Sequence, residues 1–176
     1  MNRLTALAAA LFLLAAAAPA QTAPAGPYAL YEFLIGEWDI AREGGPSMMV
    51  ARFRWGSNRS YIWYAAALLK PQGEEPHFEG VLMWNGVSKK LDMLLMLDLS
   101  ERASAQERGT MSIGRDGAIV RDIVGSYADG RTQRFRQTYR RLTGDSVETT
   151  VMRETPQGWL PTFPGSERLI MTRRTP

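Results

Sequence analysis

Polar side chains that could orient a bound molecule lie among apolar residues in the second half of the chain. Four predicted strands, 107–114, 118–126, 131–142 and 146–154, are joined by turns at Asp116-Gly117, Asp129-Gly130 and Gly144-Asp145. Because residues alternate between the two faces of a strand, two-residue turns would bring one set of side chains to a common face. That face carries the candidate ligand-binding residues Asp122, Phe135, Gln137, Tyr139 and Thr150.

The opposite face of these strands is rich in arginine, with Arg121, Arg134, Arg136, Arg140 and Arg153. Five guanidinium groups cannot share a closed interior without counter-charges. The mixed face is therefore predicted to point inward, where apolar walls with a few polar groups are typical of a ligand cavity. Two alternatives stay open. The polar groups could bond one another around buried water, and a three-residue loop at 128–130 would reverse the register and put Asp122 outside.

A hairpin around Asn85-Gly86 joins the predicted strands 77–84 and 90–99. One of its faces is wholly apolar and includes Trp84, which is predicted to point inward as a further wall of the cavity. The other face carries an apolar patch of Val81, Met83, Leu94 and Met96. This patch either forms a homodimer or partner surface or is covered by an N-terminal helix.

The hairpin of strands 47–56 and 60–69 offers a choice between two interiors. If Arg52 and Arg54 pointed inward with Tyr61 and Trp63, they would build an anion site with cation–π walls. We favour the other orientation, with the arginines at the surface, because it buries no guanidinium group. The inward side chains are then Met49, Ala51, Phe53, Trp55, Ile62 and Tyr64.

Several kinds of chemistry are excluded by residue type. The chain has no Cys and one His, so it has no thiolate nucleophile, no Cys-ligated zinc and no His-rich metal site. It has neither a G-x-S-x-G motif nor a Gly-rich loop between a strand and a helix. His77 is interpreted as a solvated surface side chain. We therefore predict non-catalytic binding of a small apolar or amphipathic molecule, with no cofactor and no metal; a protein-interaction module with a filled core and an enzyme that uses the cavity remain alternatives.

The composition of the 176 residues is that of one globular domain, with 45% hydrophobic and 22% charged residues. The formal net charge is +3, and the basic residues are interspersed with acidic ones and not gathered in one block, so no nucleic-acid surface is predicted. Residues 1–20 combine Arg3, an apolar run and the ending Ala18-Pro19-Ala20, which is typical of a cleaved secretory signal and too short for a membrane span. Residues 21–27 are interpreted as a flexible leader, and residues 28–176 as one domain of a periplasmic or secreted protein.

Strand-like segments separated by turn residues fill the chain after Gly36. The spacing of Leu30, Phe33 and Leu34 predicts one short helix before it. A meander of this many antiparallel strands must close into a barrel or split into a sandwich, and we favour a barrel of about eight to ten strands. The strands are predicted at 37–43, 47–56, 60–69, 77–84, 90–99, 107–114, 118–126, 131–142, 146–154 and 167–174.

The segment 155–166 contains three prolines, so no regular structure is predicted for it. Its apolar side chains Trp159, Leu160 and Phe163 need cover. The segment could fold over one mouth of the barrel as a mobile lid, or fill that mouth as a fixed plug.

The sequence Phe33-Leu34-Ile35-Gly36-Glu37-Trp38, followed by Gly80-x-x-x-Trp84-Asn85, two Asp-Gly hairpins and a late Gly158-Trp159 loop, carries a family resemblance. It resembles the DUF1579-like exported bacterial domains, which are related to the lipocalin-like (calycin) barrels. The resemblance implies a closed antiparallel barrel in which Gly36 and Trp38 are structural and Trp38 lies near the helix against an arginine of the last strand, here Arg168 or Arg173. Related haem-binding barrels use a His near the C-terminus; this chain has none there, so haem binding is not expected.

Overall fold

The computed structural model describes residues 26–97 and 105–175. The predicted signal peptide at residues 1–20 lies outside the described residues, as does most of the predicted leader at residues 21–27. Within the described part, the chain is all-β apart from two short 3-10 helices, which confirms the predicted fold class.

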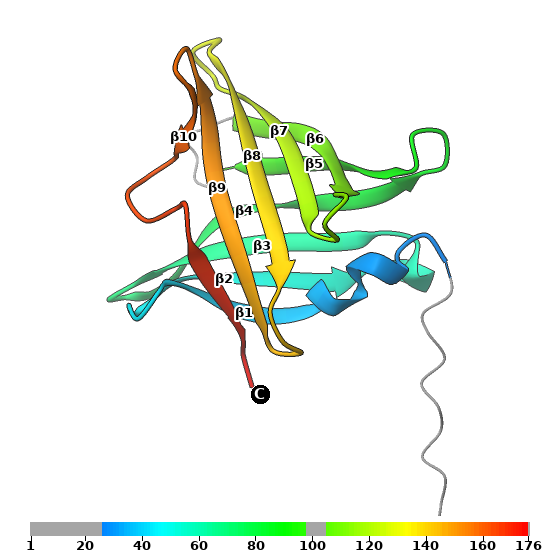
Figure 1. Ribbon diagram of the computed structural model, residues 1–176, viewed down its shortest axis with the longest axis horizontal. Coiled ribbons are helices and arrows are strands. Elements are labelled where there is room, and N and C mark those ends of the chain that lie inside the picture. Colours follow the sequence, from blue (N-terminus) through cyan, green and yellow to red (C-terminus); the bar gives the residue numbers. More distant parts are fainter. Residues whose placement is uncertain (1–25, 98–104, 176) are drawn as a thin grey trace, which may run out of the picture.

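The strands follow one another as antiparallel neighbours (Figure 1). Ten of them close a barrel, because β8 pairs with β9 and β9 pairs with β11, which lies beside β1. The elements are η1 (Ala29–Leu34), β1 (Gly36–Arg42), β2 (Ser47–Trp55), η2 (Ser57–Arg59), β3 (Ile62–Lys70), β4 (Gly73–Asn85), β5 (Lys90–Leu97), β6 (Ala105–Ile113), β7 (Ile119–Ser126), β8 (Thr132–Arg141), β9 (Ser146–Thr155), β10 (Gly158–Pro161) and β11 (Leu169–Arg173).

The short strand β10 corrects the expectation that 155–166 has no regular structure. It pairs with the second half of β9 on the edge that β11 leaves free. The prolines do not prevent this pairing, because Pro161 stands at the last position of β10 and Pro156 lies before its first. Strand β4 is also longer than predicted and begins at Gly73 instead of residue 77.

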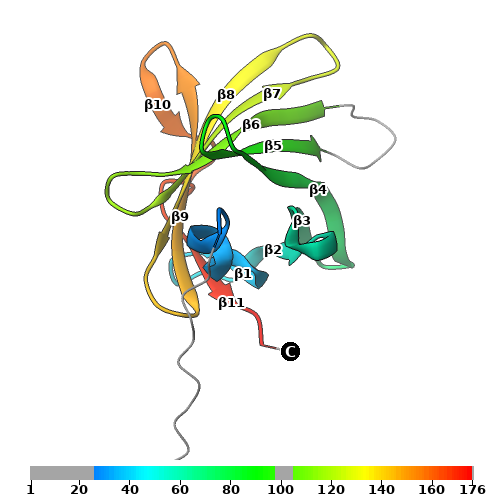
Figure 2. The ribbon, with the colours of Figure 1, turned by 90° about the vertical axis from the view of Figure 1, so that its right-hand side faces the viewer.

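One end of the barrel is closed by η1, which Figure 2 shows in front of the strands. Tyr31 and Leu34 from η1 are buried in the barrel core. The Tyr31 hydroxyl donates a hydrogen bond to the Met111 carbonyl at 3.1 Å, and burial raises the pKa of this phenol to about 12. This end is therefore packed with side chains.

Trp38 and Arg173 form the junction between η1, β1 and β11. The Trp38 indole N–H donates to the Leu34 carbonyl at 2.7 Å, and the Arg173 guanidinium lies 4.3 Å above the indole ring. Arg173 also donates to the backbone carbonyls of Phe33 and Ile35, both at 2.9 Å. Of the two arginines that the resemblance allowed, Arg173 is the partner of Trp38.

Gly36 and Arg168 are the other two residues for which a structural role was predicted. Gly36 has a φ of +133°, and a Cβ there would lie 2.5 Å from Arg173 Nη1, so this position requires glycine. Arg168 lies at the surface, where it pairs with Glu43 at 2.6 Å and with Glu148 at 3.0 Å. Arg168 is therefore the one of the two candidate arginines that is not the partner of Trp38.

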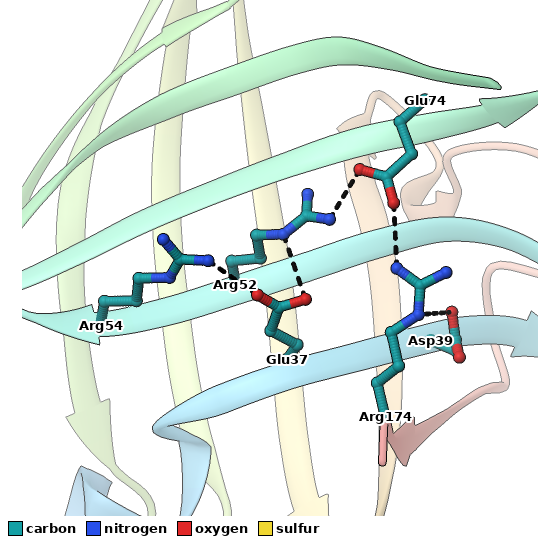
Figure 3. A network of polar contacts seen from close by, with 6 residues as sticks. All are labelled: Glu37, Asp39, Arg52, Arg54, Glu74 and Arg174. Carbon is teal, nitrogen blue, oxygen red and sulfur yellow. Dashed lines mark hydrogen bonds and ion pairs between the residues drawn. The ribbon is translucent and has the colours of Figure 1, made fainter. Parts of the chain in front are cut away.

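The outer face of β1, β2 and β4 carries a network of ion pairs that reaches the segment after β11 (Figure 3). Arg52 bonds Glu74 at 2.6 Å, and Arg54 bonds Glu37 at 2.7 Å while lying 5.7 Å from the Trp63 ring. The predicted surface position of both arginines is confirmed. The network consists of Glu37, Asp39, Arg52, Arg54, Glu74 and Arg174.

Three hairpin turns that were expected to have two residues have three. In the hairpins β6–β7, β7–β8 and β8–β9, backbone hydrogen bonds from Gly114 to Ala118, Tyr127 to Arg131 and Leu142 to Ser146 leave the loops 115–117, 128–130 and 143–145. Gly117 and Gly130 end their loops with φ of +78° and +81°, as expected of three-residue hairpin loops. An extra loop residue shifts the strand pairing by one position, so residues that were predicted to share one face of the sheet lie on opposite faces.

Candidate functional site

A cavity of about 540 Å³ occupies the barrel interior toward the end opposite η1. Its volume lies within the range of roughly 300–1,000 Å³ that is usual for small-molecule sites. Most of its wall is apolar and comes from strands on all sides of the barrel. The lining residues are Ile40, Met48, Met49, Tyr64, His77, Phe78, Leu97, Ala105, Glu107, Arg121, Ile123, Tyr127, Phe135, Gln137, Thr149, Val151, Thr162, Phe163 and Leu169.

Strand β8 presents the predicted residues Phe135 and Gln137 to this cavity. Tyr139 also points inward and is fully buried at the inner end of the cavity, beside Tyr64. Trp84 packs against the core at the η1 end, where its backbone N–H donates to the Tyr28 hydroxyl at 2.9 Å. The structure thus brings Phe135, Gln137 and Tyr139 together and leaves Trp84 out.

The predicted inward orientation of Asp122 and Thr150 is wrong. Asp122 lies opposite Arg136 on the outer face and bonds its Nε at 2.7 Å. Thr150 lies opposite Thr138 on the outer face, with 2.8 Å between the two hydroxyls. The cause is the three-residue loops, which put the neighbouring residues Arg121 and Thr149 inside instead.

Arg121 is the central side chain that the sequence prediction missed. It is 3% exposed, and its Nη2 donates to Glu107 Oε2 at 2.8 Å. Its guanidinium lies 5.3 Å from the Tyr64 ring and 5.8 Å from the Phe78 ring. Five unpaired arginines cannot be buried together, but one arginine with a carboxylate partner can. A Glu at an inward position of the preceding hairpin strand was the signal that could have revealed the pair.

Arg121 and Glu107 are part of a polar layer inside the barrel, and two tyrosine hydroxyls continue this layer. Tyr139 lies 3.5 Å from Arg121 Nη1 and 3.3 Å from the Tyr64 hydroxyl. Burial, together with the neighbouring Tyr139, raises the pKa of Tyr64 well above its ordinary value, so this phenol stays protonated. Burial acts to lower the pKa of Arg121, but Tyr139, Tyr64 and Glu107 raise it above its ordinary value, so the guanidinium stays charged.

Gln137 completes the layer on the β8–β9 side. Its amide Nε2 donates to the Thr149 hydroxyl at 3.1 Å, and both side chains are buried. The layer separates the packed η1 end from the apolar cavity. Chemically, it offers hydrogen-bond donors and acceptors to a molecule whose body fills the apolar part.

His77 and Phe163 also line the cavity. His77 is the extra residue of a β-bulge in β4 and lines the cavity, in place of the solvated surface position that was predicted. Phe163 is the one predicted apolar residue of segment 155–166 that reaches the cavity. Trp159 instead lies 4.8 Å from Arg136 on the outer face, and Leu160 is exposed.

Within residues 26–97 and 105–175, no cluster of three or more His, Cys, Asp or Glu side chains could hold a metal ion. In the same part of the chain, no helix has the length and apolar character needed to cross a membrane. No protein-family model matches the sequence, and no curated protein matches it significantly. The resemblance to the DUF1579-like domains therefore stays a prediction.

Proposed function

We propose that this protein is an exported binding protein that holds a small, largely apolar molecule inside its barrel. The observation that carries the proposal is the cavity of about 540 Å³, which has apolar walls and one polar layer at its inner end. Export is inferred from the sequence of residues 1–20.

The shape and lining of the cavity favour an apolar body with one polar group. Phe78, Ile123, Phe135 and Val151 belong to its apolar wall, where burying apolar surface gains about 25 cal/mol per Å². Most of the polar side chains that line the cavity belong to the layer around Arg121, and His77, Tyr127 and Thr162 are the others. A fully polar ligand would leave many of its groups without partners in this cavity.

Binding can be measured with the neutral fluorophore N-phenyl-1-naphthylamine, whose emission rises when it enters an apolar site. The test variant is Ile123→Phe, which adds volume inside the cavity. The matched control is Val124→Phe, the next residue of β7, which is 40% exposed on the outer face.

We expect saturable binding by the wild type and by Val124→Phe, and at least about tenfold weaker binding by Ile123→Phe. Equal affinity in the two variants would place the fluorophore outside the barrel. No saturable binding by the folded wild type would contradict the proposal.

A second candidate function rests on the outer face of β4 and β5. Met83, Leu94 and Met96 are 51%, 42% and 52% exposed, and Val81 lies among them. The expectation that the N-terminal helix covers this patch is wrong, because η1 packs into the barrel core. The patch would suit a homodimer or a partner surface.

Sedimentation velocity over a range of protein concentrations tests the dimer. A dimer that Leu94→Glu converts to monomers would support it, with the outer-face variant Val124→Glu as the control. A wild-type monomer at all concentrations would exclude this homodimer.

A further inference from the structure

We propose that the cavity selects a ligand whose polar group is an uncharged hydrogen-bond acceptor, such as a ketone or amide carbonyl, over one that carries a carboxylate. This inference rests on the proposed binding function and deepens it by naming the ligand class. It follows from the donors that the polar layer leaves without a partner and from the charge balance of that layer.

The first donor without a partner is the Nε–H of Arg121. The guanidinium bonds Glu107 through Nη2 and Tyr139 through Nη1, whereas Nε has no hydrogen-bond partner in the described part of the chain. A buried donor without an acceptor is destabilising, because it has lost its hydration and gained no hydrogen bond. A ligand acceptor that reaches Arg121 through the cavity, with a small shift of the side chain, would remove this destabilisation.

The second donor comes from the two tyrosines. Tyr64 and Tyr139 have two O–H hydrogens and share one contact of 3.3 Å, while Tyr139 also accepts from Arg121. One phenolic hydrogen therefore points elsewhere, and no other acceptor for it is seen among the described residues. Tyr139 accepts from Arg121 and can donate to Tyr64, which leaves the Tyr64 hydrogen unused. Tyr64 lines the cavity, so a ligand oxygen there would accept this hydrogen as well as a hydrogen bond from Arg121.

The charge of the layer decides which kind of acceptor fits. Glu107 neutralises Arg121 at 2.8 Å, and the two side chains are 11% and 4% exposed. A ligand carboxylate would be attracted by Arg121 and repelled by Glu107 at similar range, so the loss of its hydration would not be offset. A carbonyl loses far less hydration and still accepts both hydrogen bonds.

His77 and Tyr127 are the other titratable side chains that line the cavity. Burial, and to a lesser degree the Glu107 carboxylate, raises the pKa of Tyr127, so this phenol adds no charge. The His77 ring lies 5.6 Å from the Phe78 ring. The charges of Glu107 and Arg121 cancel, so the polar layer carries no net charge.

The experiment compares 2-decanone with decanoate, which have the same number of carbon atoms, as competitors of N-phenyl-1-naphthylamine at pH 8. Each is titrated into the wild type, Glu107→Gln and Asp122→Asn. Glu107→Gln keeps an acceptor beside Arg121 but removes the neutralising charge. Asp122→Asn removes the same charge from the outer face, where Asp122 pairs with Arg136, and is the matched control.

We expect the wild type and Asp122→Asn to bind 2-decanone at least about tenfold more tightly than decanoate. In Glu107→Gln this ratio should fall at least about tenfold, because the unpaired Arg121 then attracts the carboxylate. If Glu107→Gln does not fold, the wild-type ratio still decides.

Decanoate binding as tightly as 2-decanone to the wild type would overturn the selectivity and leave the binding function standing. Equal changes of the ratio in Glu107→Gln and Asp122→Asn would also overturn it, because net charge alone would then explain the effect. If neither molecule displaces the fluorophore and the fluorophore itself does not bind, the proposed function fails together with this inference.

Discussion

Replacing Glu107 with Leu should be one of the most destabilising single changes in the barrel. It removes the carboxylate from a pair whose side chains are 11% and 4% exposed, so screening by solvent is small. Breaking one partner of such a pair costs about 3–5 kcal/mol, because the other charge stays buried. Arg121 keeps its contacts with Tyr139 and the Tyr64 ring, so we expect the lower end of this range, about 3 kcal/mol.

The measurements are urea unfolding and thermal unfolding, both followed by tryptophan fluorescence and circular dichroism. For a domain of this size, about 3 kcal/mol corresponds to a fall of roughly 6–12 °C in the melting temperature. The matched control is Asp122→Leu, which breaks the ion pair with Arg136 on the outer face, where both side chains are more than 40% exposed. This surface pair should cost less than about 1 kcal/mol.

The double variant Glu107→Leu/Arg121→Met separates the pair from its surroundings. It replaces both charges with apolar side chains of similar size, a change that is often neutral or stabilising. We expect a free energy of unfolding near that of the wild type. The single variant Arg121→Met completes the comparison. If Glu107→Leu costs no more than Asp122→Leu, or if the effects of Glu107→Leu and Arg121→Met simply add in the double variant, the inward orientation of this pair is refuted.

Three further outcomes are expected. Gly36→Ala should cost about 1–3 kcal/mol in urea unfolding, because φ is +133° there and the added Cβ would meet Arg173; an unchanged midpoint would contradict this. Arg174→Gln should cost less than about 1 kcal/mol at pH 7. The Arg174 guanidinium holds the pKa of Glu74 below its ordinary value of 4.5, so this stabilisation is present above pH 4.5 and is lost as pH falls through the lowered pKa; an equal difference at pH 3 and pH 7 would contradict it. The full chain produced in a bacterial host should yield a periplasmic protein whose measured mass matches a chain that begins at Gln21. A protein that keeps residues 1–20 would contradict export.

The strands were predictable because their sequence pattern is local. Alternation of apolar and polar residues, bounded by Gly, Pro, Asn and Asp, gave ten strands close to their observed positions. Closure into a barrel followed from the need to hide sheet edges. The additional strand β10 was missed, because its sequence lies between prolines and is too short to show an alternating pattern.

The site was only partly predictable, because it depends on loop lengths. A loop such as Ala128-Asp129-Gly130 fits a two-residue turn and a three-residue turn equally well from residue types alone, since both place Gly last. On β8, Arg134 and Arg136 identified the outer face without help from the loops, so Phe135 and Gln137 were placed correctly. On β7, the loop decided between Arg121 and Asp122, and the choice was wrong.

The stability experiment and the selectivity experiment both test the ion pair between Glu107 and Arg121. If Glu107→Leu/Arg121→Met is as stable as the wild type, the ion pair makes no net contribution to folding, and stability does not explain why the barrel buries two charges. The pair would then act through what it does to a ligand: it supplies a donor and cancels the charge that would favour a carboxylate. The wild type should then prefer 2-decanone over decane, because only the ketone accepts hydrogen bonds from the layer. The double variant should bind N-phenyl-1-naphthylamine as the wild type does but lose this preference, because both molecules then meet an apolar wall. A double variant that keeps this preference would show that the acceptor is held by other groups of the layer, with Gln137 and Tyr64 the first to replace.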